Sequence, residues 1–197
     1  MRNKLNINLF KNILNILIME QGYLKIILGC MYAGKTSKLV NIYKMMKFSN
    51  ITTLVINYAE DKRYDNTKLS THDKTMIPCV QTLKLMELIN NKEISEKVII
   101  INEGQFFPDL LIFVKEMLSK DKHIYVCGLD GDYKMNKFGQ ILDIIPFCNE
   151  VEKLSAICSI CKNGTKAYFT KRITDEKRQK VIGSDNYLPV CRKCHSF

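Results

Sequence analysis

Residues 27–40 read ILGCMYAGKTSKLV, and this stretch decides the fold. A short apolar run ends at Gly29, and Gly34, Lys35 and Thr36 complete the spacing Gly-x-x-x-x-Gly-Lys-Ser/Thr. Glycines at these positions let the backbone curl so that several N–H groups point at one anion, beside the positive end of a helix. The spacing therefore predicts a phosphate-binding loop, in which Lys35 reaches the β- and γ-phosphates of a nucleotide and Thr36 holds Mg²⁺.

The flanks of this loop suit a strand before it and a helix after it. The apolar run 22–28 reads as a buried strand, and 37–48 reads as an amphipathic helix. Further strands are expected at 51–60 and 98–102, a strand followed by a loop at 123–133, and helices at 81–97 and 108–120. This alternation predicts an α/β fold of the P-loop NTPase type, with an open, mostly parallel sheet and helices on both faces. A chance glycine turn between a strand and a helix is the alternative.

The formal net charge of +10 raises the question of nucleic-acid binding. Most of the 30 basic residues are lysine, and they are spread along the chain rather than clustered. A mildly basic field also suits small polyanions such as ATP, so we expect no nucleic-acid partner. We expect no membrane partner either, because the N-terminal segment is too short and too polar to span a bilayer.

The eight cysteines fall into two groups. Cys30, Cys79, Cys127 and Cys148 stand singly in or near apolar segments, where a free cysteine behaves as a small buried hydrophobe. Together with a nucleotide site, this pattern indicates a reducing, nucleotide-rich compartment, and we expect a cytoplasmic protein.

The other four cysteines form the pairs Cys158-Ser-Ile-Cys161 and Cys191-Arg-Lys-Cys194. Two such pairs can complete a tetrahedral Zn²⁺ site with no open position, so the metal is expected to be structural. It would pin both ends of the long intervening segment 162–190. Two disulfides or a redox dithiol are the alternatives, and the adjoining His195 is a weaker candidate ligand.

An acidic residue, Glu103, comes just after the expected strand 98–102. Phosphoryl transfer needs the phosphates held, their charge neutralised, and the accepting hydroxyl relieved of its proton. A carboxylate at this place can accept that proton, so Glu103 is the candidate general base. A helix-capping or loop acid is the alternative.

Taken together, the motifs resemble the zinc-containing thymidine kinases, which occur in animals, many bacteria and large DNA viruses. They are the phosphate loop, EGQFFPD at 103–109, FGQIL at 138–142, and the C-terminal TKRI, VIG and VCRKC. The resemblance covers residues 23–195. It implies ATP-dependent phosphorylation of the thymidine 5′-hydroxyl by a homotetramer, with ATP, Mg²⁺ and structural Zn²⁺.

The resemblance also implies roles for individual residues. Those for ATP and its metal are Gly29, Cys30, Met31, Tyr32, Ala33, Gly34, Lys35, Thr36, Asp61, Arg63, Asn102 and Gln105. Those for the nucleoside are Phe106, Leu129, Tyr133, Phe138, Thr170, Gln179, Val181, Ile182, Gly183 and Tyr187. Glu103 matches the proton acceptor. Val181, Gly183 and Tyr187 belong to a lasso whose backbone meets the pyrimidine edge, and the zinc cysteines anchor both its ends.

The chain departs from the family pattern at three places. Asn102 stands where an aspartate linked to Mg²⁺ is usual, and Tyr133 stands where phenylalanine is usual. The lasso is one residue longer near Phe169 and one shorter near Ser184. Two other functions stay open at this point: a catalytically weakened nucleotide-binding relative, because of Asn102, and a zinc-knuckle nucleic-acid-binding ATPase.

The 197 residues have room for one core domain and a small appendage. We expect a P-loop nucleotide-binding domain at 21–150 and a zinc-binding lasso domain at 151–197. Residues 1–20 are expected to be an extension outside the fold, with a targeting or packed helix as the alternative.

Overall fold

The computed structural model describes residues 21–60, 68–70, 75–91, 93–181, 183 and 185–195. The expected N-terminal extension therefore lies outside the described residues. So do three of the expected site residues, Asp61, Arg63 and Ile182.

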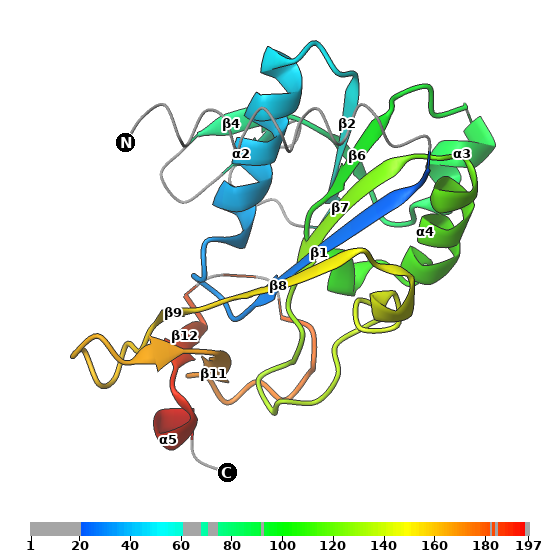
Figure 1. The fold of residues 1–197 in the computed structure, drawn as a ribbon. Coiled ribbons are helices and arrows are strands. Elements are labelled where there is room, and N and C mark those ends of the chain that lie inside the picture. Colours follow the sequence, from blue (N-terminus) through cyan, green and yellow to red (C-terminus); the bar gives the residue numbers. More distant parts are fainter. Residues whose placement is uncertain are drawn as a thin grey trace, which may run out of the picture.

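Within the described residues, the core is one open sheet of six strands (Figure 1). The strands are β1 (Tyr23–Gly29), β2 (Thr53–Tyr58), β5 (Val80–Thr82), β6 (Val98–Ile101), β7 (His123–Gly128) and β8 (Glu150–Leu154). They lie in the order β5-β2-β6-β7-β1-β8, and neighbouring strands are parallel throughout. The expected α/β fold is confirmed, and the carboxyl ends of the strands meet at one edge, where ligands bind in such folds.

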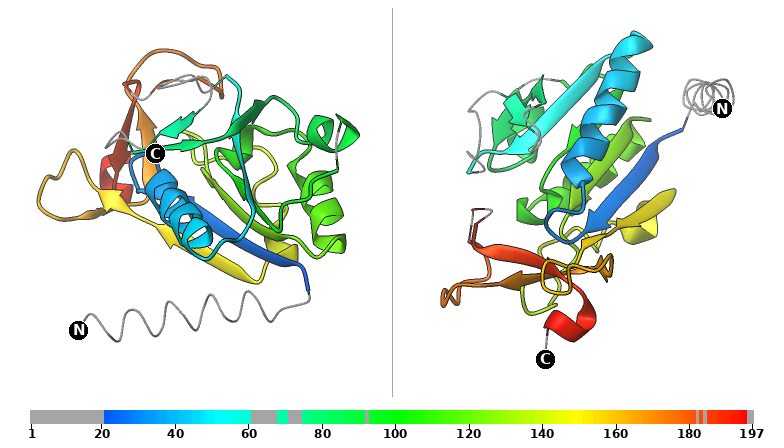
Figure 2. Two further views of the ribbon diagram at one scale, coloured as in Figure 1. Left: turned by 90° about the horizontal axis from the view of Figure 1, so that it is seen from above. Right: turned by 90° about the vertical axis from the view of Figure 1, so that its left-hand side faces the viewer.

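Helices cover both faces of this sheet (Figure 2). Helix α2 (Lys35–Phe48) packs on one face, while α3 (Met86–Asn91) and α4 (Leu110–Ser119) pack on the other. The four residues of β6 are all fully buried and alternate between the two hydrophobic clusters. A strand that is buried on both faces has a continuous apolar sequence, which explains why the sequence of β6 is Val-Ile-Ile-Ile. None of the described helices is both long and apolar enough to cross a membrane.

The prediction of a single helix at 81–97 is wrong. Its first residues belong to β5, which pairs with β2 at the edge of the sheet, and only α3 is helical. The carboxylate of Asp109 accepts hydrogen bonds from the N–H groups of Leu85 at 3.1 Å and Met86 at 2.9 Å. These N–H groups at the start of the helix are thus satisfied by a residue far along the chain, which fixes where α3 begins.

The polar segment 61–74, DKRYDNTKLSTHDK, has almost no apolar periodicity and is predicted to be a loop, but part of it forms a strand. The described piece, β3 (Lys68–Ser70), pairs antiparallel with β4 (Met76–Pro78). Leu69 and Ile77 are buried and join the cluster on the α2 face of the sheet. This small hairpin brings Leu69 and Ser70 to the carboxyl edge of the sheet, where they line a pocket.

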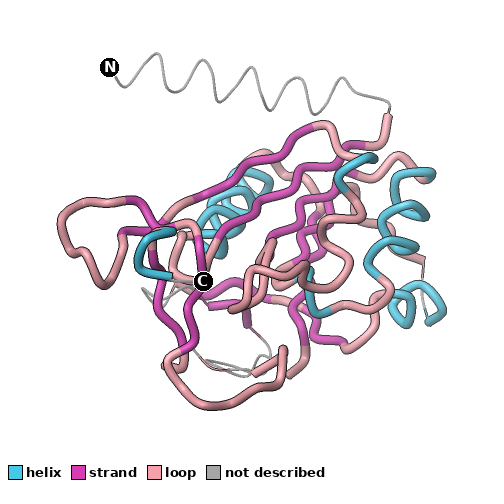
Figure 3. The backbone as a smooth tube through the Cα atoms, turned by 90° about the horizontal axis from the view of Figure 1, so that it is seen from below, coloured by secondary structure: helices cyan, strands magenta, loops and turns pink. Residues whose placement is uncertain are grey.

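A smaller lobe follows β8 and lies beside the sheet (Figure 3). It contains two antiparallel pairs, β9 (Ala156–Ile157) with β10 (Lys166–Ala167) and β11 (Phe169–Arg172) with β12 (Tyr187–Val190). The short helix α5 (Arg192–His195) lies at the end of the lobe. Two single-turn helices lie outside it: η1 (Gly104–Phe106) follows β6, and η2 (Ile145–Phe147) precedes β8. The main sheet itself extends to Leu154, and the division into two domains stays a proposal.

Candidate active site

The loop between β1 and α2 has a backbone suited to binding phosphate. A Cβ at Gly29 would lie 2.7 Å from the carbonyl oxygen of Leu154, and its φ of 148° also favours glycine. Tyr32 and Gly34 have positive φ angles of 63° and 83°. Left-handed residues in such a loop turn successive N–H groups toward one side, which creates a concave anion site.

Lys35 lies inside this loop. Its side chain is only 8% exposed, and its Nζ donates a hydrogen bond to the carbonyl oxygen of Cys30 at 2.8 Å. The ammonium is thereby held at the N-terminal end of α2, where the helix dipole also favours an anion. The geometry fits the phosphate-binding role expected for Lys35.

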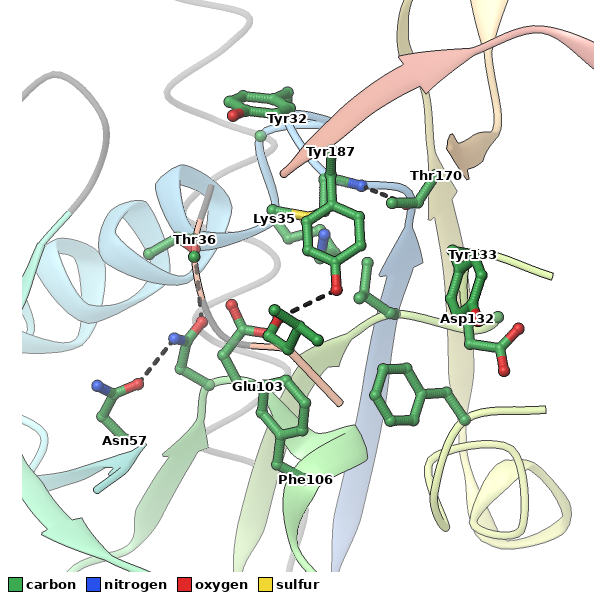
Figure 4. A pocket seen from close by; sticks show the side chains of 18 of the residues that line it. Tyr32, Lys35, Thr36, Asn57, Glu103, Phe106, Asp132, Tyr133, Thr170 and Tyr187 are labelled. Carbon is green, nitrogen blue, oxygen red and sulfur yellow. Dashed lines mark hydrogen bonds between the residues drawn. The ribbon is translucent and has the colours of Figure 1, made fainter. Parts of the chain in front are cut away.

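Thr36, beside the loop (Figure 4), contacts the side chain of Asn102. The Thr36 hydroxyl donates to Asn102 Oδ1 at 3.4 Å, and the Cys127 thiol donates to the same oxygen at 3.1 Å. The Asn102 amide nitrogen donates to Asn57 Oδ1 at 2.8 Å. These contacts fix the amide, so its oxygen faces Thr36. A hydroxyl and an amide oxygen at one place fit the oxygen ligands that Mg²⁺ prefers.

Glu103 follows Asn102 in the chain, and its backbone has a left-handed conformation with φ 56° and ψ 42°. Such a backbone costs a non-glycine residue about 1–3 kcal/mol and is found mostly at functional sites. The Gln105 amide nitrogen donates to Glu103 Oε2 at 2.7 Å, while Gln105 Oε1 accepts from the N–H of Leu129 at 3.0 Å. A Cβ at Gly128 would collide with Gln105 Oε1. Gln105 is therefore a fixed support that orients the Glu103 carboxylate.

Lys35, Thr36, Asn102 and Glu103 line one pocket between the sheet and the lobe (Figure 4). The expected site residues that line it are Met31, Tyr32, Gly34, Lys35, Thr36, Asn102, Glu103, Phe106, Leu129, Tyr133, Phe138, Thr170, Gln179, Val181, Gly183 and Tyr187. Four other expected residues, Gly29, Cys30, Ala33 and Gln105, are not among the lining residues. Two of them contact lining residues instead: the carbonyl oxygen of Cys30 accepts a hydrogen bond from Lys35, and Gln105 donates one to Glu103.

The structure adds lining residues that sequence reasoning did not identify. They are Ser37, Asn57, Leu69, Ser70, Gly131 and Asp132. For Asn57 a signal was present, because it is a polar residue near the carboxyl end of a buried strand next to β6. For Asp132 the signal was the acid in the loop after β7. Asp132 is only 6% exposed, and its Oδ1 accepts hydrogen bonds from the N–H groups of Lys134 at 2.8 Å and Asn136 at 2.9 Å.

Aromatic side chains form one wall of the pocket. The rings of Phe106 and Phe138 meet edge to face, with centroids 5.4 Å apart and planes at 85°. Tyr58 packs on Phe106 at 5.2 Å from the other side. An apolar slot with aromatic faces suits a planar ring such as a nucleobase.

The segment between β11 and β12, residues 173–186, is called the lasso below. Tyr187, at its end, donates from its hydroxyl to the carbonyl oxygen of Val181 at 3.0 Å (Figure 4). The Gln179 amide nitrogen donates to Asp132 Oδ2 at 2.8 Å, so the lasso is tied to the loop after β7. Residues expected from the resemblance to face the base are thus held at one side of the pocket.

A second contact ties the lasso to the end of β2. Lys180 Nζ lies 2.6 Å from a carboxylate oxygen of Glu60 and 2.6 Å from the hydroxyl of Tyr58. The same ammonium lies 4.3 Å from the centre of the Tyr58 ring and 5.4 Å from that of Phe106. The lasso therefore contacts both sides of the pocket mouth.

Cys158, Cys161, Cys191 and Cys194 come together in the lobe, with all four sulfur atoms within 4.8 Å of one another. The Cys161 sulfur lies 3.4 Å from that of Cys194 and 3.8 Å from that of Cys191. Four thiolates around Zn²⁺ at about 2.3 Å give sulfur–sulfur distances of about 3.8 Å, so the cluster fits this metal. A hydrogen bond from the backbone N–H of Cys161 lowers the pKa of Cys158 to about 6, whereas the hydrogen bond with the Cys161 sulfur raises the pKa of Cys194 to about 12.

Of the alternatives for the cysteines, the two disulfides are not formed in the structure. All eight are free thiols in the structure. His195, the weaker candidate ligand, places Nε2 at 3.0 Å from the carbonyl oxygen of Tyr133. A carbonyl only accepts, so Nε2 carries the proton and donates. His195 therefore joins α5 to the loop after β7 instead of completing the metal cluster.

The lobe also contacts the phosphate loop directly. The Thr170 hydroxyl accepts a hydrogen bond from the N–H of Met31 at 3.1 Å (Figure 4), and the Cys30 thiol donates to the carbonyl oxygen of Ala167 at 3.3 Å. Burial raises the pKa of the Cys30 thiol, which keeps it protonated as a donor. Cys30 and Ala167 also share a buried apolar cluster with Cys158. The cysteine cluster is thus structurally connected to the loop.

A phosphate loop at the carboxyl edge of a parallel sheet, with a lysine, a hydroxyl and a nearby carboxylate, defines a P-loop phosphotransferase. The family model described as "Thymidine kinase" matches residues 22–195. The chain therefore belongs to the thymidine kinase family, and it is an enzyme of that class.

Individual relatives agree with this assignment. The chain is 42% identical to a thymidine kinase of Yaba monkey tumor virus over 177 residues, which cover 89% of this chain and 96% of that one. It is 39% identical to a thymidine kinase of Myxoma virus over 91% of this chain and 99% of that one. With a cytosolic thymidine kinase of Gallus gallus the identity is 35%, over 89% of this chain and 77% of that one.

Proposed function

We propose that the pocket transfers the γ-phosphoryl group of ATP to the 5′-hydroxyl of thymidine. The observation that carries this proposal is a single cavity lined by the phosphate loop and by an aromatic slot, with Glu103 also in its lining. A reaction between a nucleotide phosphate and a nucleoside hydroxyl needs both groups in one enclosed site with a base beside them. The phosphorylated product is dTMP.

On the phosphate side, the loop from Gly29 to Thr36 would hold ATP. Its backbone surrounds the phosphates, and Lys35 neutralises part of their charge. Asp61 and Arg63 would act at the same side, as the family resemblance implies. A bound Mg²⁺ would supply positive charge that neutralises the transferred phosphoryl group. The oxygens of Thr36 and Asn102 are the groups of this chain that would hold it.

Between the phosphate side and the nucleoside side of the pocket, Glu103 would accept the proton of the 5′-hydroxyl. Gln105 donates to one of its carboxylate oxygens and is itself held by Leu129, so the base is oriented before substrate binds. A hydrogen bond to a carboxylate favours its charged form, which is the form that acts as a base. The left-handed backbone at Glu103 holds the side chain at the end of β6.

On the nucleoside side, the base would lie against Phe106, Leu129 and Phe138. Tyr133, Thr170 and Tyr187 would enclose it together with the lasso residues Gln179, Val181, Ile182 and Gly183. A planar apolar slot with fixed polar groups at its rim binds a base and selects by its edge.

The zinc proposed at the four cysteines has a structural role. It would join the two CxxC turns and so fix both strands that carry the lasso, β11 and β12. We further propose that the enzyme is a homotetramer, as the resemblance implies, and that it is cytoplasmic, as its cysteine pattern and nucleotide site indicate. Light scattering of the purified enzyme tests the tetramer, and fractionation of cells that express it tests the compartment.

A coupled assay with ATP, Mg²⁺ and a panel of nucleosides tests the reaction. We expect phosphorylation of thymidine, and no stimulation of ATP hydrolysis by DNA or RNA. Hydrolysis of ATP that depends on nucleic acid, with no nucleoside phosphorylated, would contradict the proposal and favour a nucleic-acid-binding ATPase. Activity only at very high Mg²⁺ would favour the weakened relative.

A further inference from the structure

Arg172, the last residue of β11, has a buried guanidinium group that donates hydrogen bonds to carbonyl oxygen atoms of the lasso. Its side chain is only 8% exposed. Nη1 donates to the carbonyl oxygens of Glu176 at 2.7 Å and Arg178 at 2.6 Å. Nη2 donates to the carbonyl oxygen of Gln179 at 3.1 Å. One cation thus orients three peptide groups of the lasso.

The same guanidinium fixes two tyrosines that line the pocket. Nη2 donates to the hydroxyl of Tyr187 at 2.6 Å. A guanidinium has no acceptor, so the Tyr187 proton must point elsewhere, and it goes to the carbonyl oxygen of Val181. The Arg172 Cζ atom also lies 3.8 Å from the centre of the Tyr133 ring, a cation–π contact. Arg172 therefore sets the positions of Tyr133, Tyr187 and Val181.

These contacts concern the lasso and the nucleoside side of the pocket. Within the described part of the chain, the hydrogen bonds and ring contacts of the Arg172 guanidinium go to the lasso, Tyr133 and Tyr187, and none goes to the phosphate loop or to the four cysteines. A loop that is ordered before its ligand arrives binds with a smaller loss of entropy on association. Removal of Arg172 should therefore weaken nucleoside binding selectively, rather than ATP binding or zinc binding.

We propose that Arg172 is the positioning residue for nucleoside binding: it organises the lasso before the nucleoside enters. It does not touch the reacting atoms and acts through Tyr187, Tyr133 and the lasso backbone. The planar fork of arginine can bind several carbonyl oxygens at once, whereas lysine offers one point charge. The proposal rests on the proposed function, in which the lasso encloses the base.

The preceding residue provides a matched control. Lys171 lies next to Arg172 on β11, and its Nζ donates to the carbonyl oxygen of Cys194 at 3.1 Å, away from the lasso. Lys171→Met and Arg172→Met each remove one long cation from the same strand. Arg172→Lys keeps the charge and removes the fork. Zinc content, measured for every variant, shows whether the lobe is still folded.

Steady-state kinetics of these variants give the first test. For Arg172→Met we expect the KM for thymidine to rise at least about tenfold while the KM for ATP stays within about twofold. Arg172→Lys should recover part of the loss, and Lys171→Met should match the wild type. An equal rise in both KM values, or a thymidine KM unchanged in Arg172→Met, would overturn the proposal.

A second test needs no catalysis. The lasso contains Lys177, Arg178 and Lys180, which are trypsin sites. Without nucleoside, Arg172→Met should be cut within the lasso about tenfold faster than the wild type and Lys171→Met, as mass spectrometry of the fragments shows. Equal cutting rates would contradict the organising role even if the enzyme accepts another nucleoside. If the wild type fails to phosphorylate thymidine but the cutting rates differ, only the proposed function fails.

Discussion

Asn102 and Asn57 are joined by a hydrogen bond of 2.8 Å between their side-chain amides, at the carboxyl ends of the adjacent parallel strands β6 and β2. Both groups are neutral, and both line the pocket beside Thr36. The resemblance noted from the sequence implies an aspartate linked to Mg²⁺ at position 102. The pair therefore places an uncharged oxygen where the resemblance implies a negative one.

The first prediction concerns this charge. Asn102→Asp should lower the Mg²⁺ concentration needed for half-maximal rate, because it adds a carboxylate near a divalent cation. The Asn57 amide can rotate to donate to the new carboxylate, so the fold should tolerate the change. A Mg²⁺ titration at fixed ATP, read both as rate and as ATP binding, measures the effect.

Asn57→Asp is the charge-matched control. It adds the same charge at the other end of the hydrogen bond, and its effect on the Mg²⁺ requirement should be smaller. Superimposable titrations of the wild type and Asn102→Asp would mean that position 102 only packs the end of β6.

Glu103→Gln tests the general base. The change keeps shape and burial but removes the group that accepts the proton, so turnover should fall by about 10²–10⁴. ATP binding, measured by calorimetry, should stay unchanged. Glu116→Gln, on α4, removes an equivalent carboxylate from an i,i+4 pair with Lys120 and should leave turnover intact. A Glu103→Gln enzyme with more than half of its turnover would place the base elsewhere.

Local sequence patterns predicted much of the fold and part of the site. The phosphate loop needs its glycines for backbone reasons that are local, and the apolar run VIII reflects burial on both faces of the sheet. The end of that run also predicted where Glu103 would lie. Each of these features depends on residues close together in the chain, so a spacing or a period is enough to identify it.

Features that depend on distant partners were not predictable in this way. The start of α3 is set by Asp109, which satisfies N–H groups about twenty positions earlier. The position of Asp132 after β7 was a weak signal, and its contact with Gln179 depends on the distant lasso. Arg172 is recognisable only through its hydrogen bonds to the lasso carbonyls. In each case, a polar group is buried because a remote segment satisfies it.

Tyr133→Phe tests the departure from the usual phenylalanine. The Tyr133 hydroxyl donates to the carbonyl oxygen of Lys177 at 3.0 Å, a tie to the lasso that phenylalanine lacks. The ring and its contact with Arg172 would remain. A single hydrogen bond of this kind contributes about 0.5–1.5 kcal/mol, so the KM for thymidine should rise by roughly two- to tenfold. Comparison of thymidine and ATP kinetics checks this, and an unchanged thymidine KM would show that the hydroxyl is irrelevant.

The final prediction concerns the cysteine cluster. Purified enzyme should contain about one Zn²⁺ per chain, and Cys191→Ser combined with Cys194→Ser should lose it, because two of four thiolates are gone. Both cysteines follow β12, so metal loss should free one end of the lasso and weaken thymidine binding. The lobe also touches the phosphate loop through Thr170 and Met31, so ATP binding should weaken as well, though less.

Elemental analysis and binding measurements on the same preparations decide the matter. Cys79→Ser and Cys148→Ser change cysteines outside the cluster and should keep both the metal and the activity. Full zinc content in the double variant, or no zinc in the wild type, would exclude the site. If the double variant lost zinc but bound thymidine normally, the metal would not be what holds the lasso, and contacts such as those of Arg172 would be sufficient to order it.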